Sequence, residues 1–436
     1  RPVWPRHAAH PTLTLVHQKQ KPYSPRIRGE SKGTFMSTIE QFRQDTRAWL
    51  EANCPLSMRT GMAEGDVVWG SQNPQFPCED ARLWFERMRD KRWFCPEWPE
   101  EYGGAGLSDE QLSVLESEMR RIKCRPPQIN LGIWMLGPVL LAFGSDAQKR
   151  DLLPPIARGE VRWCQGFSEP NAGSDLASLK MAARDAGDHF VVDGSKIWTS
   201  YGDKSDWMYA LVRTDFSAPK HEGISLIVLD MRSPGVTPKP IDLISGKSAF
   251  CQVFFDGVKV PKSQLIGPLN GGWNLAKYLL QHERKAMSKF GEFSLPSHFD
   301  LLALMREYVP APQTMSEHAL QARATACAMN EHAYNLTVQR MGEEARAGDD
   351  IGGLMSIMKL VHTEQERDKF EVLLDAMAGH AFGWESTAFS EQQLAVTRSW
   401  LNSYALTISG GSSEVQLNVI AKRVLGLPDA KKGVTP

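Results

Sequence analysis

The segment Trp163–Asp175 is rich in small residues and has the composition of a phosphate-binding turn. Its centre reads Asn171-Ala-Gly-Ser174, in which Gly173 has no side chain and Ala172 has only a methyl group. Backbone N–H groups in such a turn can approach a pyrophosphate closely, because no bulky side chain keeps the phosphate oxygens away. The residue types therefore predict an anion-binding turn.

A tryptophan follows this turn in a β-rich segment. Phe190–Trp198 contains two β-rich runs on either side of Asp193-Gly194, a dipeptide that favours a type I′ turn. We therefore predict a hairpin that presents Trp198 beside the anion-binding turn, where its indole can stack on a flat ring. The alternative is a tryptophan that is buried in a β-core.

A carboxylate flanked by apolar residues is a candidate general base. Glu283 lies in a stretch, Trp273–Phe290, whose apolar residues recur at helical spacing. Those apolar residues are Ala276, Leu279, Leu280, Met287 and Phe290. A carboxylate in an apolar slot has a raised pKa and can abstract a proton near neutral pH. The alternatives for Glu283 are a structural ion pair with another helix and a half-buried flank position.

Composition restricts the classes of function. The chain has 436 residues, which is more than one ordinary core and indicates two or three domains. Its formal net charge of −1 argues against nucleic-acid binding. Seven scattered cysteines form no C-x-x-C pair and have no zinc-ligand spacing, so we expect no metal site, and reduced thiols in a cytoplasmic protein. No apolar run is long enough to suggest a transmembrane segment.

The first 35 residues differ in composition from the rest. Residues 1–35 hold seven Lys/Arg, five prolines and one acidic residue, Glu30, without apolar periodicity. We expect this segment not to fold alone, and we interpret it as an extension that precedes a start at Met36. The alternative is a mitochondrial transit peptide, which would place the protein in the mitochondrial matrix.

Hydrophobic periodicity divides the remaining chain into three parts. It is helical over 36–159, β-like over 160–267 and helical again over 268–436, where we expect a four-helix bundle. The expected helices are Ser37–Ala52, Glu79–Lys91, Ser108–Lys123, Ile133–Phe143, Ser145–Ala157, Trp273–Phe290, Met315–Met341, Gly353–Met377 and Leu394–Leu406. The expected antiparallel strands include Trp207–Arg213, Ile224–Leu229 and Cys251–Phe255. Ser108 and Ser145 are expected N-caps.

Two motifs resemble the signature of the acyl-CoA dehydrogenase family. They are Ser168-Glu-Pro-Asn-Ala-Gly-Ser-Asp175 and Lys196-Ile-Trp-Thr-Ser200, in the order and at the separation found in the family, and the resemblance extends over Met36–Pro428. It implies an α+β fold with a helical, a β and a helical domain, FAD as cofactor and an acyl-CoA thioester as substrate. It also implies an electron-transferring flavoprotein, or a similar acceptor, as partner and a homodimer or homotetramer.

The resemblance assigns roles to individual residues. Trp198 corresponds to the indole that stacks on the flavin, Ser200 to the hydroxyl that faces its N5 atom, and Ser174 to a residue that contacts substrate. The full set of implied cofactor-binding residues is Phe167, Ser168, Gly173, Ser174, Trp198, Ser200, Ser412 and Glu414.

The catalytic base of the family occupies one of two positions. The commoner position falls here on Gly410, in Ile408-Ser-Gly-Gly-Ser-Ser-Glu-Val-Gln416, and lacks a carboxylate. The second position, used by isovaleryl-type and long-chain-type members, falls on Glu283, with Arg284 near the thioester. The resemblance therefore makes Glu283 the base. Gly410 keeps a backbone N–H for the thioester oxygen and leaves space for a branched, cyclic or otherwise bulky acyl group.

Two departures from the family pattern concern flavin binding across subunits. Met305–Pro312 replaces an Arg-Lys-x-Phe-Gly segment, and Ala378-Gly-His380 replaces a Gly-Gly pair. These changes are consistent with a hetero-oligomer in which a sister chain supplies the missing groups. The alternatives to a dehydrogenase are a flavin oxidase or monooxygenase of the same fold, and a flavin-binding or non-catalytic subunit of a hetero-oligomeric enzyme.

Overall fold

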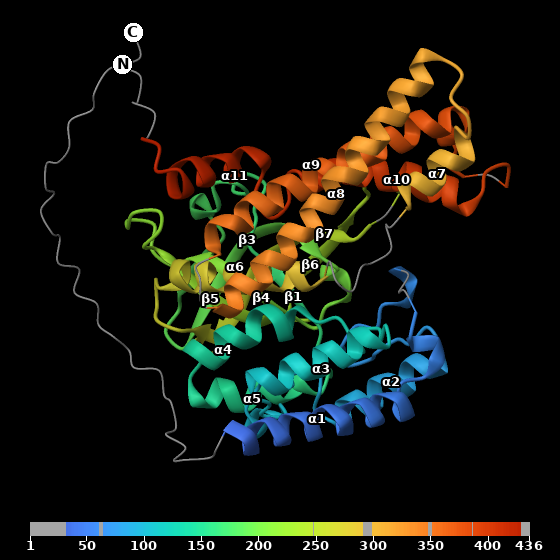
Figure 1. Ribbon diagram of the computed structural model, residues 1–436. Helices are drawn as coiled ribbons and strands as arrows, with labels where there is room; N and C mark the ends of the chain where they lie inside the picture. Colours follow the sequence, from blue (N-terminus) through green and yellow to red (C-terminus); the bar gives the residue numbers. More distant parts are fainter. Residues whose placement is uncertain are drawn as a thin grey trace, which may run out of the picture.

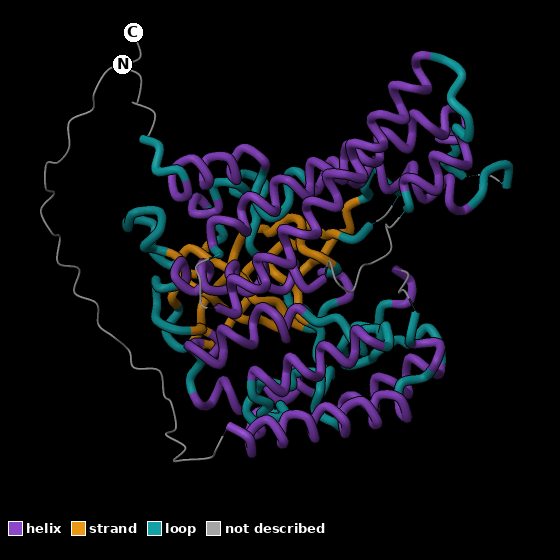
Figure 2. Tube along the Cα trace, viewed as in Figure 1, coloured by secondary structure: helices purple, strands orange, loops and turns teal. Residues whose placement is uncertain are grey.

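The computed structural model describes residues 32–60, 64–246, 248–290, 299–347, 351–385 and 387–428. Three layers are visible in Figure 1: helices α1 to α5 on one side, a sheet in the centre, and helices α8 to α11 on the other side. Figure 2 shows the strands gathered between the two helical layers. The expected α+β fold with its helical, β and helical order is confirmed.

The N-terminal layer forms largely where local signals predict helices. Ser108 and Ser145 cap their helices in capping boxes, each accepting from the backbone N–H three residues later. The first helix begins at Lys32 rather than at Ser37; the rest of the expected extension lies outside the described residues. A π-helical turn, Gly132–Leu136, starts the expected helix Ile133–Phe143. The helices are α1 Lys32–Asn53, α2 Glu79–Asp90, α3 Asp109–Arg121, α4 Gly137–Phe143 and α5 Asp146–Ala157.

The sheet has the strand order β6-β7-β3-β2-β4-β5-β8, with β1 beside β4. Its strands are β1 Trp163–Gly166, β2 Ala182–Asp185, β3 His189–Ser200, β4 Trp207–Arg213, β5 Ile224–Asp230, β6 Val236–Ile241, β7 Phe250–Pro261 and β8 Leu265–Ile266. Most pairs are antiparallel, but β1 and β2 each run parallel to β4. The expected antiparallel β-domain is therefore confirmed, and the two parallel pairs arise because the long connection through β2 and β3 returns the chain in the direction of β1.

The predicted hairpin at Asp193-Gly194 is wrong. Both residues lie inside the continuous strand β3, whose pairing with β7 shifts register between Val192 and Gly194. Gly194 adopts φ +138°, and a Cβ there would lie 3.0 Å from the Cα of Met181. The glycine therefore serves a β-bulge and a close strand contact rather than a turn. The hairpin joins β2 to β3 instead, where Ala186 N donates to His189 O at 2.9 Å.

The C-terminal helices surround α9. The helices are α6 Gly272–Phe290, α7 Leu301–Tyr308, α8 Met315–Ala347, α9 Gly352–Met377, α10 Glu391–Leu406 and α11 Ser413–Val419. Helices α7, α8, α10 and α11 all contact α9. Helix α6 instead buries Leu275, Ala276 and Leu279 in the apolar core shared with the N-terminal helices. No helix within the described ranges combines the length and apolarity needed to cross a bilayer.

Candidate functional site

The two motifs that the sequence singles out meet where β3 passes the end of β1. Ile197 N donates to Ser168 O at 2.9 Å, so the two segments are joined through their backbones. Lys196 Nζ adds a bond to Phe167 O at 3.1 Å and a charged contact to Glu169 Oε1 at 2.8 Å. We call residues 167–175 and 196–200 together the cradle.

A buried ion pair holds the cradle in place. Lys196 is fully buried, and burial lowers the pKa of Lys196 to about 8. The carboxylate of Glu169 opposes that shift and also accepts from the backbone N–H groups of Lys180 at 2.7 Å and Met181 at 2.9 Å. The Glu169 side chain thus links the two segments of the cradle to the chain that leads into β2. The sequence alone does not reveal this pair, since nothing local indicates that a lysine in a strand points into the core.

Trp198 occupies a strained and exposed position. It lies in a second register shift of β3, between Lys196 and Thr199, with φ +59°. Its side chain is 54 % exposed and meets Phe250 edge-on, with ring centroids 6.1 Å apart. The alternative of a tryptophan buried in the β-core is therefore wrong. A positive φ is costly for a bulky residue, and such strain clusters at functional sites.

The small-residue turn lies open beside this segment. Glu169 and Ala172 exchange backbone hydrogen bonds of 3.1 and 3.0 Å, which closes the turn. Gly173 and Ser174 are exposed, and a Cβ added to Gly173 would meet no atom of the described part of the chain within 4 Å. Asp175 turns away to an ion pair with Lys220, at 2.8 Å. The turn therefore has free space around the groups expected to approach a phosphate.

The cradle fits the flavin that the family resemblance implies. An exposed indole offers a stacking face, and an open turn offers backbone donors. Thr199 Oγ1 is buried and has no hydrogen-bond partner among the described residues, and its neighbour Ser200 is half-buried. Phe167 is buried and packs edge-on against Tyr209, which gives the cradle a rigid floor. Ser200 is predicted from the sequence but Thr199 is not, because the burial of Thr199 depends on the bulge in β3.

Glu283 and Arg284 lie on α6, the helix in which they were expected. The buried residues Ala276 and Leu279 fall on the apolar stripe that the sequence predicted, and Leu280 is half-buried. The side chains from residue 283 to residue 290 lie outside the described residues, so the roles of Glu283 and Arg284 stay predictions.

The C-terminal motif is built against α9. Gly410 adopts φ +65° and is exposed. Ser412 caps α11 by accepting from Val415 N at 3.3 Å, and Lys359 Nζ of α9 donates to Gly411 O at 2.7 Å. Hydrogen bonds from its own backbone N–H and from Ser412 hold the pKa of the exposed Glu414 below its usual value. The structure thus joins the two segments of the cradle, while the polar contacts of this motif run to α9.

Comparison with known proteins identifies the family. The models for the N-terminal, middle and C-terminal domains of acyl-CoA dehydrogenases match residues 37–160, 164–258 and 270–425. The acyl-CoA dehydrogenase IpdE1 of Mycobacterium tuberculosis is 34 % identical over 91 % of this chain and 100 % of its own length. FadE34 of the same organism is also 34 % identical, over 78 % of this chain but only 45 % of its own length.

Solved structures agree in fold. A protein named "Tcur3481-Tcur3483 steroid ACAD" covers 90 % of this chain and 98 % of its own, with a TM-score of 0.70 and 28 % identity. The ChsE4-ChsE5 complex from Mycobacterium tuberculosis covers 93 % and 100 %, with a TM-score of 0.65 and 25 % identity. With all three domain models matched and a full-length relative above 30 % identity, the chain belongs to the acyl-CoA dehydrogenase family, whose members are FAD-dependent oxidoreductases that act on acyl-CoA thioesters.

Proposed function

We propose that the chain dehydrogenates a bulky acyl-CoA thioester between its α- and β-carbons, with Glu283 as the base. FAD, when bound in the cradle, accepts the hydride that leaves the β-carbon. Glu283 takes the proton from the α-carbon, and the two carbons become doubly bonded. The observation that carries the proposal is the exposed, strained Trp198 beside the open turn. The indole can stack on a flavin ring, and the backbone of the turn next to it can bind the pyrophosphate.

The remaining groups bind the thioester. The backbone N–H of Gly410 donates to the thioester oxygen and stabilises the enolate-like charge that develops there. Arg284 and Ser174 hold the thioester and the pantetheine arm. The residues that would line the flavin in the cradle are Phe167, Ser168, Gly173, Trp198 and Ser200. Two residues of the C-terminal motif, Ser412 and Glu414, would contact it as well. Glu283 and Gly410 are on different elements, so both α6 and the segment before α11 must face the cradle in the assembled enzyme.

A bulky acyl group is supported by the missing side chain at residue 410. A Cβ added to Gly410 would meet no described atom within 4 Å, so the position leaves open space where the commoner members of the family have a glutamate. A relative that is 28 % identical carries the name "steroid ACAD", which supports the same class of substrate. We therefore propose a branched or cyclic acyl group over a short straight chain.

We also propose that a second subunit covers the C-terminal motif. Large apolar side chains near it are exposed in the single chain, which marks a surface for protein contact. They are Tyr404, Ile408, Leu417, Leu425 and Leu427. The second subunit is a sister chain or a second copy of this chain. The names of two similar structures, Tcur3481-Tcur3483 and the ChsE4-ChsE5 complex, each list two different proteins, which supports a sister chain. An electron-transferring flavoprotein is the proposed acceptor and the cytoplasm the proposed location, in keeping with bacterial relatives and seven free cysteines.

The test is to purify the chain, record its visible spectrum and add acyl-CoAs anaerobically. We expect a flavin spectrum that is bleached by cyclic or branched acyl-CoAs and little changed by butyryl-CoA. A protein that stays colourless after incubation with excess FAD would contradict the flavin site. Bleaching by butyryl-CoA alone would contradict the bulky substrate, and rapid oxygen consumption with substrate would favour the oxidase alternative.

A further inference from the structure

Two cysteines far apart in sequence face each other in the N-terminal domain. Cys54 follows the last residue of α1, and Cys124 follows the end of α3. Their sulfur atoms are 3.6 Å apart, and both residues are buried. A disulfide has an S–S distance of about 2.05 Å, so the two sulfurs need to move by less than the width of one atom to bond.

The backbone holds the two thiols in register. Arg125 N, next to Cys124, donates to Met58 O at 2.9 Å, which ties the segment after α3 to the turn after Cys54. Trp84 Nε1 donates to Arg125 O at 3.1 Å from α2. These hydrogen bonds fix the backbone next to both cysteines, so the short distance between the thiols does not depend on side-chain rotamers alone.

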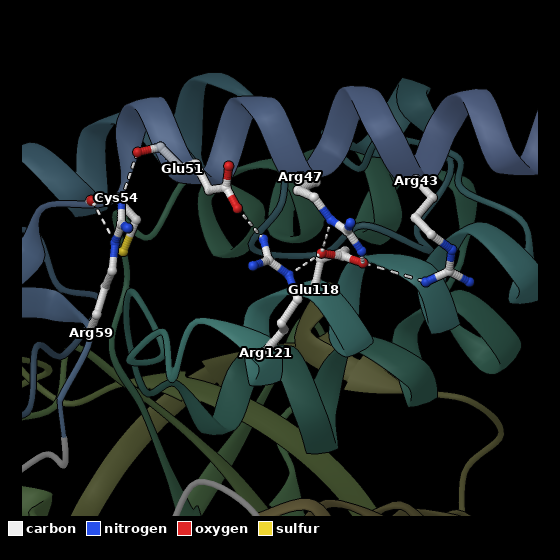
Figure 3. Close-up of polar contacts among 7 residues, drawn as sticks. All are labelled: Arg43, Arg47, Glu51, Cys54, Arg59, Glu118 and Arg121. Atoms are coloured by element: carbon white, nitrogen blue, oxygen red, sulfur yellow. Dashed lines mark hydrogen bonds and ion pairs between the residues drawn. The ribbon is translucent and has the colours of Figure 1, made fainter.

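Arginines surround Cys54 and make the two thiols unequal. Arg59 donates to Cys54 O from Nε at 3.1 Å and from Nη2 at 2.7 Å, and Figure 3 shows its guanidinium beside the Cys54 side chain. Arg87 reaches Asn53 O at 2.5 Å. The hydrogen bond from Cys124 lowers the pKa of Cys54, and these cations lower it further. The hydrogen bond to Cys54, together with burial, raises the pKa of Cys124.

Cys95 offers a contrast within the same domain. It is fully buried, and burial raises its pKa well above the usual value. A thiolate is the reactive form of cysteine, and the charge of Glu97 adds to burial in raising the pKa of Cys95, whereas the pKa of Cys54 is lowered. Position, partner and charge thus separate the Cys54–Cys124 pair from an ordinary core cysteine.

We propose that Cys54 and Cys124 form a redox-active pair that closes to a disulfide by exchange with a small-molecule disulfide. The Cys54 thiolate attacks one sulfur of the small disulfide, forms a mixed disulfide and releases one thiolate. Cys124 then loses its proton and attacks the Cys54 sulfur, which releases the second thiolate. The protein loses two protons and two electrons, and the small disulfide becomes two thiols.

The bond would fasten the outer helical layer. It links residues 70 positions apart and encloses α2 and α3, so it removes much of the freedom of the unfolded N-terminal domain. Neither cysteine belongs to the cradle or to the C-terminal motif. The inference therefore stands apart from the proposed function, and its test uses no flavin or acyl-CoA readout.

The experiment incubates the full chain in glutathione buffers of increasing oxidised fraction, blocks free thiols with N-ethylmaleimide and maps the peptides without reduction. We expect a Cys54–Cys124 bond to form before any other, and the melting temperature to rise by about 5 °C. In Cys124→Ser the bond cannot close, so a glutathione adduct should accumulate on Cys54. In Cys54→Ser, Cys124 should stay unmodified.

Cys95→Ser is the matched control, because it removes a buried cysteine outside the pair and should leave the bond and the rise in melting temperature intact. The peptide map of the wild-type chain tests the proposal even if a variant folds poorly. Adducts on the exposed Cys78 with both Cys54 and Cys124 still free, or a bond that joins either of them to another cysteine, would overturn the proposal.

Discussion

At the scale of single residues, one ion pair supports the strained backbone of the cradle. Trp198 at φ +59° and Tyr201 at φ +50° both adopt conformations that cost free energy for residues with a side chain. The buried contact between Lys196 and Glu169 lies two residues before Trp198 and joins β3 to the small-residue turn. The position of the exposed indole is therefore fixed by the buried residues next to it in the chain, and not by burial of the indole itself.

The first prediction concerns the proposed base. Glu283→Gln should retain flavin and acyl-CoA binding, because the amide is nearly isosteric. It should slow flavin reduction by about 100-fold or more, the typical size of general-base removal. Anaerobic stopped-flow in the visible absorption band of the flavin checks this, with Glu307→Gln on the exposed face of α7 as control. Reduction of the Glu283→Gln flavin at the native rate would show that another group abstracts the proton.

A second change tests whether the other family position can replace Glu283. Gly410→Glu in the Glu283→Gln background should restore part of the activity with small straight-chain acyl-CoAs and exclude bulky ones. The restoration should be incomplete, because φ +65° costs a residue with a Cβ about 1–2 kcal/mol. Restored activity toward bulky substrates would contradict the space argument. The measurement is flavin bleaching with butyryl-CoA against a cyclic acyl-CoA.

The third prediction concerns the indole. Trp198→Ala should weaken FAD binding by about 1–3 kcal/mol, the value of aromatic stacking with area burial. The melting temperature of the flavin-free protein should change little, since the side chain is 54 % exposed. Titration of the flavin-free protein with FAD measures the affinity. Trp384→Ala, in the C-terminal helical region, is the control, and an unchanged affinity in Trp198→Ala would remove the indole from the flavin site.

At the scale of elements, a buried carboxylate fixes α1 on α3. Glu118 of α3 receives Arg47 and Arg121 at 2.9 and 2.6 Å and Arg43 at 3.5 Å, and Figure 3 shows the three guanidinium groups around it. The hydrogen bond from Arg47 contributes most to lowering the pKa of Glu118 to about 2, against the opposing effect of burial. The three guanidinium groups offset the cost of removing the Glu118 carboxylate from water.

The fourth prediction follows from that cluster. Glu118→Gln should lower the free energy of unfolding by about 2 kcal/mol at pH 7, because three guanidinium groups lose their counter-charge. The pKa of Glu118 is lowered in the folded state, so its stabilisation is complete above the unfolded value near 4.5 and fades as pH falls toward 2. Urea unfolding at pH 7, 5 and 4 checks this, and the difference from wild type should shrink at the lowest pH.

Glu40→Gln is the matched control for Glu118→Gln. Glu40 pairs with Arg43 on the exposed face of α1, with its side chain 59 % exposed. Exposed pairs contribute between about 0 and 1 kcal/mol, so its removal should change stability little. Equal effects of the two substitutions would show that the burial of Glu118 does not matter.

At the scale of the whole molecule, the exposed apolar side chains around α11 form the surface at which we propose a subunit contact. The fifth prediction is that Leu417→Arg reduces the oligomeric mass seen by light scattering, because a charge replaces an apolar side chain that is 53 % exposed in the single chain. Phe216→Arg, on the β4–β5 connection, is the control and should leave the mass unchanged. A Leu417→Arg protein of native mass would place the subunit contact elsewhere.

The sequence by itself determined the family, the order of the three parts and the features set by near neighbours along the chain. The capping boxes at Ser108 and Ser145 and the strand Trp207–Arg213 formed as predicted, because each depends on residues a few positions apart. The burial of Ala276 and Leu279 on α6 also followed from spacing alone. Such signals need no knowledge of distant contacts.

Only the tertiary structure decided how the cradle is built. Asp193-Gly194 has the composition of a turn, yet β7 pairs across it and Met181 packs on the glycine, so β3 continues through a bulge. The second register shift of β3 leaves Trp198 exposed, while Lys196 two residues earlier is buried in its contact with Glu169. Register and burial depend on strands far away in sequence, and for that reason local propensity placed the motifs in the right domain but gave the wrong turn.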